Sequence, residues 1–303
     1  MSSEINPAVK SATDQLRNLL EGPDICVMPC CFDALSARLV ERAGFPLTFM
    51  SGFAVSATRL ALPDTGLISY GEMVDQGRAI CQAVDIPVIG DGDTGYGNAV
   101  NVRRAVKGYA EAGFSAVMIE DQLSPKRCGH TQGKKVVPRD EALMRLRAAV
   151  DMAAEMRAAG RDILVLARTD ARATHGFDEA LLRARAFKDI GADILFLEAP
   201  ETEQEMAAFC AAVPGPKLAN MLEEGKTPVL PPARLQEIGY KIAAYPLTLL
   251  SASVKAMEGA LDDLKAGTAP RGIKSFADLR QIVGFDAYDV EAARYAEPDG
   301  DGD

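Results

Sequence analysis

The chain of 303 residues has no tryptophan and only two histidines. Two histidines cannot build a multi-histidine zinc site, so any metal is expected to be a hard cation held by carboxylates. The six cysteines form no CxxC pair, and the adjacent Cys30 and Cys31 are poorly spaced for a disulfide framework. Free thiols are typical of a reducing compartment, so a cytoplasmic protein is expected.

Long apolar runs and basic blocks are also lacking. No run approaches the roughly 20 apolar residues that span a bilayer, and the polar N-terminus has no signal-peptide core. The net charge is −10, from 33 basic and 43 acidic side chains. Nucleic acid and membrane are therefore not expected as partners. The expected partner is a small molecule.

What the chain does have is an alternation of short apolar runs with longer amphipathic segments, such as 101–112, 139–159, 178–190, 202–212 and 232–238. Continuous apolar runs bounded by polar, glycine or proline residues predict strands buried on both faces. No GxGxxG turn follows the first of them, which argues against a doubly wound sheet. We expect an α/β fold, a single (β/α)8 barrel domain over residues 1–303. The eight predicted strands are 25–30, 47–51, 86–90, 115–119, 163–167, 193–197, 216–220 and 241–245.

Polar residues follow the ends of several of these strands. In a barrel the C-terminal ends of the strands meet at one mouth, where barrel active sites lie. The sequence therefore predicts a polar site built from Ser51-Gly52, Asp91-Gly92-Asp93, Glu120-Asp121, Arg168-Thr169-Asp170, Glu198 and Asn220.

Beyond the eighth strand, residues 251–295 continue with a helical pattern and exceed a minimal barrel. These helices are expected to pack on a neighbouring subunit. The acidic tail 297–303 is predicted to be disordered.

The segment 91–98 carries two carboxylates among three glycines. Mg²⁺ prefers oxygen ligands and usually keeps several waters. We expect Asp91 to bind the ion directly, with Asp93 and Glu120 holding waters around it. The alternative is an ordinary turn rich in glycine and aspartate.

Cys128 lies in a polar loop among Lys126, Arg127 and His130. Nearby positive charges favour the thiolate form of a cysteine, so Cys128 is a catalytic candidate. A buried structural cysteine is the alternative. His130, beside Gly129, is expected to orient a substrate carboxylate.

Arg168 ends the fifth predicted strand, and a guanidinium can grip a carboxylate with two hydrogen bonds. The alternative is a salt bridge to carboxylates of the barrel. Glu198 and Asn220 are expected to complete the polar wall. Thr227 is a candidate donor to a substrate oxygen, or else a turn residue.

The run Lys126-Arg127-Cys128-Gly129-His130 resembles the hallmark of the carbon–carbon lyase branch of the isocitrate lyase/phosphoenolpyruvate mutase superfamily. The runs 63–66, 91–98, 168–171 and 220–228 match as well, and the resemblance covers roughly residues 14–290. It implies a (β/α)8 barrel, Mg²⁺ or Mn²⁺, a mobile gating loop with the cysteine, and a homotetramer with exchanged C-terminal helices. It also implies a substrate site that includes Ser51, Gly52, Phe53 and Asp64.

Within the superfamily the chain looks closest to the short lyases that cleave 2-alkylmalates, 2,3-dimethylmalate or 2-methylisocitrate. The resemblance implies retro-Claisen cleavage of such a dicarboxylate to pyruvate and a carboxylic acid. Arg168 would stabilise the enediolate, and Cys128 would protonate it. Glu120 completes the expected catalytic set.

Phe49 departs from the family pattern, because methylisocitrate lyases tend to have tyrosine there, so the base is unassigned. Alternatives are a carboxyvinyl-carboxyphosphonate phosphonomutase, an oxaloacetate hydrolase or decarboxylase, and a non-enzymatic dicarboxylate sensor.

Overall fold

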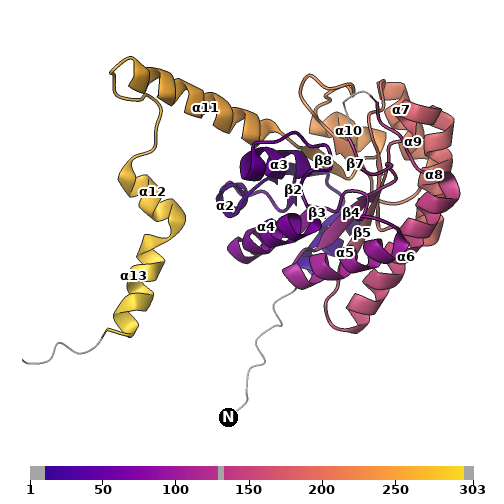
Figure 1. Ribbon diagram of the computed structural model, residues 1–303, viewed down its shortest axis with the longest axis horizontal. Helices are drawn as coiled ribbons and strands as arrows, with labels where there is room; N and C mark the ends of the chain where they lie inside the picture. The colour runs from indigo at the N-terminus through magenta and orange to yellow at the C-terminus, as the bar shows by residue number, and fades with distance from the viewer. Residues whose placement is uncertain (1–10, 129–132, 297–303) are drawn as a thin grey trace, which may run out of the picture. The chain divides into compact units, whose positions relative to one another are not determined.

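The computed structural model describes residues 11–128 and 133–296. The predictions for Gly129, His130 and the tail 297–303 therefore lie outside the described residues. Eight parallel strands form one sheet in the order β6-β5-β4-β3-β2-β1-β8-β7. A parallel bridge between Leu195 and Lys217 joins the two edges, so the sheet closes into the predicted (β/α)8 barrel (Figure 1). The strands are β1 (Cys26–Cys31), β2 (Thr48–Met50), β3 (Val88–Asp91), β4 (Ala116–Glu120), β5 (Leu164–Thr169), β6 (Ile194–Leu197), β7 (Leu218–Asn220) and β8 (Ile242–Tyr245).

Helices follow the strands and surround the barrel. Each of the eight strands overlaps a predicted apolar run, and the five predicted helical segments correspond to α5, α6, α8, α9 and α10. An apolar cluster fills the space between strands and helices. The helices up to β8 are α1 (Ala12–Glu21), α2 (Ala34–Arg42), α3 (Gly52–Leu60), α4 (Tyr70–Ala83), α5 (Ala99–Ala112), α6 (Arg139–Ala158), α7 (Arg172–His175), α8 (Phe177–Ile190), α9 (Glu203–Ala212) and α10 (Pro232–Ile238).

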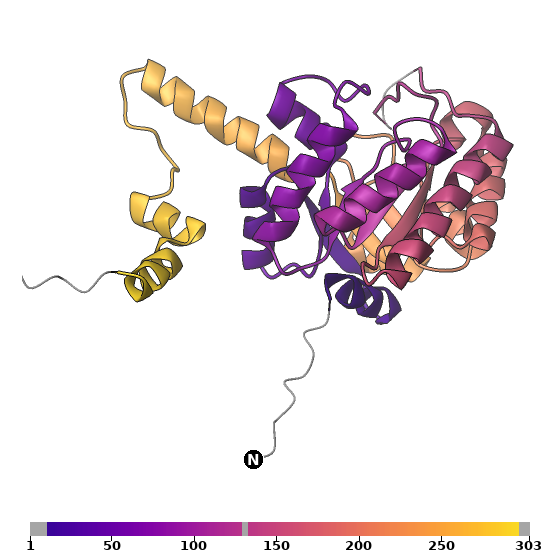
Figure 2. The same ribbon diagram turned by 60° about the horizontal axis from the view of Figure 1, so that its bottom comes forward.

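A second apolar cluster fills the inside of the barrel. Side chains alternate along a strand, so residues two apart point to the same side. Met28 of β1, Ile89 of β3 and Leu166 of β5 belong to this interior cluster. Leu16 of α1 joins it and is completely buried. Figure 2 shows α1, drawn in indigo, below the N-terminal end of the barrel. The barrel is therefore packed along its axis and closed at that end.

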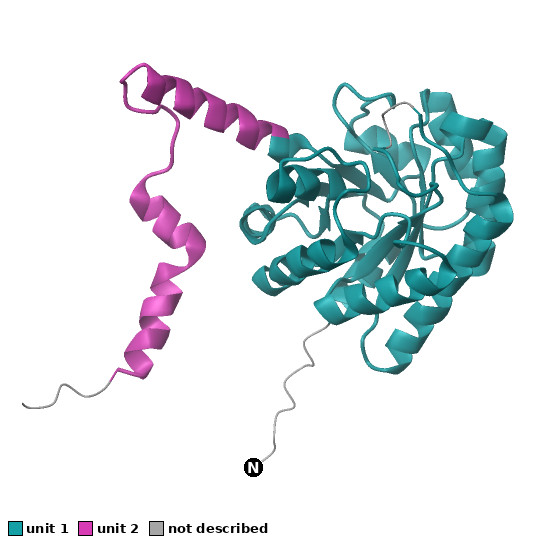
Figure 3. Ribbon diagram, viewed as in Figure 1, with its two compact units in different colours: residues 1–250 teal, residues 251–303 magenta. Residues whose placement is uncertain are grey.

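Residues 1–250 and 251–303 form two compact units (Figure 3). The second contains most of α11 (Thr248–Lys265), then α12 (Phe276–Val283) and α13 (Phe285–Arg294). Neither α12 nor α13 has a buried residue. None of the described helices combines the length and the apolarity that crossing a membrane requires.

Candidate active site

The inward-facing side chains change from apolar to polar at the C-terminal end of the barrel. The residue two positions after an interior apolar residue continues the same inward row. Glu120 follows Met118 in this way, and Arg168 follows Leu166. The same alternation brings in Ser51 after Phe49, Asp91 after Ile89, Glu198 after Phe196 and Asn220 after Leu218.

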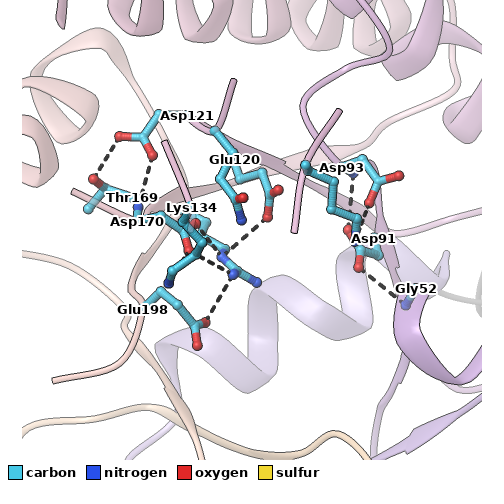
Figure 4. Close-up of polar contacts among 12 residues, drawn as sticks. Gly52, Asp91, Asp93, Glu120, Asp121, Lys134, Thr169, Asp170 and Glu198 are labelled. Atoms are coloured by element: carbon cyan, nitrogen blue, oxygen red, sulfur yellow. Dashed lines mark hydrogen bonds and ion pairs between the residues drawn. The ribbon is translucent and has the colours of Figure 1, made fainter. Parts of the chain in front are cut away.

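The Asp91 carboxylate is held against two backbone N–H groups (Figure 4). Its Oδ2 accepts from Gly52 at 3.2 Å, and its Oδ1 accepts from Asp93 at 3.0 Å. A Cβ at Gly52 would lie 2.4 Å from Asp91 Oδ2, and one at Gly92 would lie 2.5 Å from the Met118 carbonyl oxygen. Both positions therefore require glycine for this close approach.

Lys126, two residues before Cys128, links two aspartates. Its Nζ lies 2.7 Å from Asp64 Oδ1 and 2.8 Å from Asp93 Oδ1, and all three side chains are buried. Burial raises the pKa of Asp93 to about 7, although the Lys126 ammonium acts in the opposite direction. The sequence placed Lys126 beside the cysteine but gave no sign of this buried link.

Arg168 lies among three carboxylates. Its Nε is 2.9 Å from Asp170 Oδ2 and 3.3 Å from Glu120 Oε2, and its Nη2 is 3.4 Å from Glu198 Oε2 (Figure 4). Burial raises the pKa of Glu120 well above its usual range, and Arg168 only partly offsets this. Arg168 thus makes the salt bridges to barrel carboxylates that were the alternative interpretation, and it also lines the cavity described next.

One cavity at this mouth brings most of the candidate residues together. Cys128 is half-buried at its edge, and Asp91, Glu120 and Arg168 contribute from three consecutive strands. The other candidates that line it are Ser51, Phe53, Asp64, Glu198 and Asn220.

Three candidates are buried near this mouth without lining the cavity. Gly52 holds Asp91 through its backbone, and Asp93 pairs with Lys126. Thr227 is buried in the loop after β7. Gly52 and Asp93 therefore act on the cavity only through the residues that they contact.

The cavity also has apolar lining residues that the sequence did not single out. Leu222, Pro246 and Leu247 follow β7 and β8, and Cys30 lies on β1. Because β7, β8 and β1 are neighbours in the barrel, these residues form one side of the mouth. The sequence did hold a signal for Leu222, because it comes two residues after Asn220 and so continues the same inward-facing row.

The carboxylates fit a hydrated Mg²⁺ better than a fully protein-coordinated metal. Among the described residues, no group of three histidine, cysteine, aspartate or glutamate side chains is placed to hold an ion by itself. Mg²⁺ commonly takes one or two carboxylates and keeps several waters. Asp91 and Glu120 line the cavity, and the buried Glu120 Oε1 has no hydrogen-bond partner among the described residues. This donor set suits such an ion.

The fold and the cavity define a (β/α)8 barrel with carboxylates, a buried arginine and a cysteine at its C-terminal mouth. The phosphoenolpyruvate phosphomutase family model matches residues 16–265, so the chain belongs to that family. It is 41% identical to 2,3-dimethylmalate lyase of Eubacterium barkeri, over 90% of this chain and 94% of that protein. It is 40% identical to 2-methylisocitrate lyase of Aeropyrum pernix, over 93% of this chain and 91% of that protein. The predicted family and enzyme class, a carbon–carbon lyase, are confirmed.

Solved structures agree with this assignment. One of 2,3-dimethylmalate lyase superposes with a TM-score of 0.89 at 36% identity, covering 97% of this chain and 99% of that chain. One of oxaloacetate acetylhydrolase with 3,3-difluorooxalacetate gives 0.89 at 34% identity, covering 95% and 98%. One of phosphonopyruvate hydrolase with oxalate and Mg²⁺ gives 0.83 at 30% identity, covering 95% and 100%.

Proposed function

We propose that this chain is a Mg²⁺-dependent lyase that cleaves the C2–C3 bond of a 2-methylmalate with hydrogen or a small alkyl group on C3. The products would be pyruvate and a saturated carboxylic acid. The observation that carries this proposal is the convergence of Asp91, Glu120, Cys128 and Arg168 on one cavity. The lyases among its relatives support it.

Asp91 would hold the magnesium or manganese ion directly, and Glu120 and Asp93 would hold it through water. When bound, the ion would act as a Lewis acid on the 2-hydroxyl and C1 carboxylate of the substrate. Phe49 lines the cavity and offers no phenol. Glu120, a carboxylate that lines the cavity beside Arg168, is therefore our candidate to accept the hydroxyl proton.

Cleavage turns C2 into the ketone carbon of pyruvate and leaves the electron pair on C3, beside the C4 carboxylate. The Arg168 guanidinium would stabilise this enediolate. The Cys128 thiol would donate its proton to C3, which yields the saturated acid. Lys126 and Arg127 beside it in the chain would favour the thiolate that remains.

The apolar side of the cavity supports an alkyl substituent rather than a charged one. Leu222, Pro246 and Leu247 line that side. A carboxymethyl group on C3, as in 2-methylisocitrate, would need a cation there, because burying an unpaired carboxylate is costly. Of the described cations that line the cavity, Arg168 lies on β5 and the pair 126–127 follows β4, on the other side of the mouth.

The test is a substrate panel of 2-methylmalate, 2,3-dimethylmalate and 2-methylisocitrate with Mg²⁺. Pyruvate is detected with lactate dehydrogenase and NADH. We expect 2,3-dimethylmalate to give the highest kcat/KM. Absence of pyruvate from every substrate would refute the lyase, and a preference for 2-methylisocitrate would refute the alkyl substituent.

A second candidate is hydrolysis of oxaloacetate, favoured by the structural likeness to oxaloacetate acetylhydrolase. Incubation with oxaloacetate and detection of both acetate and oxalate would identify it. A phosphonomutase would instead convert carboxyphosphonoenolpyruvate, which phosphorus NMR detects.

We further propose that α12 and α13 pack on another copy of the chain, as in a helix-exchanged tetramer. Phe276, Tyr288 and Val290 are 75%, 71% and 68% exposed in the single chain. Exposed apolar surface of this kind marks an interaction surface. Light scattering after size exclusion should give a tetramer for the intact chain and a smaller species for Val290→Asp. A monomeric intact chain would contradict the proposal.

A further inference from the structure

Behind Arg168 lies a buried chain of charges that the cavity does not include. Asp170 Oδ1 accepts from Arg168 Nη2 at 3.0 Å and from Lys134 Nζ at 2.9 Å. Asp170 Oδ2 accepts from Arg168 Nε at 2.9 Å. The side chains of Lys134 and Asp170 are 2% and 0% exposed. A single carboxylate therefore joins the cavity arginine to a buried lysine.

The backbone that carries Asp170 is itself fixed. Its N–H donates to Asp121 Oδ1 at 2.8 Å, and the Thr169 hydroxyl donates to Asp121 Oδ2 at 2.7 Å. Arg183 Nη1 pairs with Asp121 Oδ2 at 3.0 Å. Asp170 is thus a rigid support for the edge of the guanidinium formed by Nε and Nη2.

The charges around Arg168 would be unfavourable for an anionic substrate without Lys134. Asp170, Glu120 and Glu198 place three carboxylates beside one guanidinium. Lys134 supplies a second positive charge to this group. Arg168 and Lys134 together outweigh the effect of burial and hold the pKa of Asp170 below its usual range. In a buried site such charges act more strongly than in water.

We propose that Lys134 and Asp170 are positioning residues for Arg168. Asp170 fixes the orientation of the guanidinium, and Lys134 offsets the charge of Asp170 so that Arg168 can attract a substrate carboxylate. Neither residue is among those that line the cavity. The inference rests on the proposed function, because it assigns Arg168 to the dicarboxylate.

The first test is Lys134→Met, which removes the charge and keeps an unbranched side chain. The probe is 2,3-dimethylsuccinate, which has both carboxylates of 2,3-dimethylmalate but no hydroxyl, so it cannot be cleaved. In calorimetric titration with Mg²⁺ present, we expect its Kd to rise about 10- to 100-fold, the range of coupling within one charge network. The KM for 2,3-dimethylmalate should rise similarly, and kcat should fall as well, because the enediolate that Arg168 stabilises carries more negative charge than the carboxylate.

Two variants separate this role from a structural one. Lys134→Arg retains the charge and should restore most of the affinity. Lys135→Met changes the exposed neighbour of Lys134 and should leave both constants unchanged. If Lys134→Met does not fold, Lys134→Gln, which keeps a hydrogen-bond donor, provides the same comparison.

The decisive measurement is a double-mutant cycle with Asp170→Asn. If Lys134 acts through Asp170, replacing it in the Asp170→Asn background should cost little further affinity. Fully additive losses, or a Lys134→Met enzyme with unchanged Kd and KM, would overturn the inference and leave the lyase proposal intact. A wild-type enzyme that neither binds the probe nor cleaves the panel would overturn both.

Discussion

The two sides of the barrel mouth differ in charge. From β3 to β6 the inward rows end in Asp91, Glu120, Arg168 and Glu198, whereas from β7 to β1 the lining is largely apolar. Asn220 stands at the boundary. In the proposed mechanism the charged side would supply the groups that break the bond, and the apolar side would contribute only its shape. We therefore assign the reaction to the first side and the choice of C3 substituent to the second.

This division implies that the two sides respond differently to substitution. Changes on the charged side should reduce activity toward every substrate. Changes on the apolar side should alter the ranking of substrates and spare the reaction.

The largest effect is expected for Asp91→Ala. Loss of a direct ligand should weaken Mg²⁺ binding by more than about 100-fold, since even supporting residues of metal sites cost 10- to 100-fold. Calorimetric titration with Mg²⁺ measures this, and Asp91→Asn shows how much depends on charge rather than on the hydrogen bonds to Gly52 and Asp93. Asp75→Ala, at an exposed carboxylate, is the control. Unchanged Mg²⁺ affinity in Asp91→Ala would show that Asp91 is not a ligand of the metal.

The second-largest effect is expected for Cys128→Ser. If the thiol is the general acid, turnover should fall by about 10²- to 10⁴-fold. Binding of Mg²⁺ and 2,3-dimethylsuccinate should persist, because Asp91 and Arg168 are unchanged. Steady-state kinetics give the first result and calorimetry the second.

The matched control is Cys210→Ser, on α9 outside the cavity, which should be neutral. Near-normal turnover of Cys128→Ser would remove this residue from the reaction and direct attention to the hydrolase.

On the apolar side, Leu222→Arg should change preference rather than destroy activity. A cation there could pair with a carboxymethyl group, so the ratio of kcat/KM for 2-methylisocitrate over 2,3-dimethylmalate should rise at least about tenfold. Leu222→Gln, similar in polarity but uncharged, should not reproduce the change. A uniform loss for both substrates would place Leu222 away from the C3 substituent.

The smallest effect concerns pH. The pKa of Asp93 is raised by burial to about 7 in the metal-free chain. Its proton must be lost for the carboxylate to support Mg²⁺, so affinity should fall as pH drops from 8 to 6, by up to about tenfold per unit. Calorimetric titrations with Mg²⁺ in buffers of different ionisation enthalpy measure how many protons are released on binding.

The raised pKa of Asp93 also makes the stability of the fold depend on pH. The folded metal-free chain holds the Asp93 proton more tightly than the unfolded chain does. The contribution of Asp93 to the free energy of unfolding should therefore decline as pH rises toward 7. Asp93→Asn should flatten both profiles, and an unchanged pH profile would exclude Asp93 as the titrating group.

The strands and the mouth could be predicted because each depends on local pattern. Buried parallel strands are continuously apolar, and a polar residue directly after such a strand lies at the C-terminal mouth. Extending the two-residue alternation would also have reached Leu222 and Pro246, which follow Asn220 and Ala244. The apolar side was thus within reach of the sequence.

The buried ion pairs could not be predicted in this way. Lys126 meets Asp64 from 62 residues away, and Lys134 meets Asp170 from 36 residues away. Lys134 stands between Gly133 and Lys135 in a polar run that reads as exposed loop. Its burial depends on the tertiary fold, since only there does a carboxylate compensate for the lost hydration.

Leu16 bears on the order of product release. Because it closes the N-terminal end of a barrel already filled by side chains, both fragments must leave through the mouth by which the substrate entered. In the proposed mechanism pyruvate would lie against the buried Asp91 and Glu120, and the saturated acid beside the half-buried Cys128, so pyruvate would depart last. Pyruvate should therefore compete directly with the substrate, whereas the saturated acid should inhibit in a mixed manner.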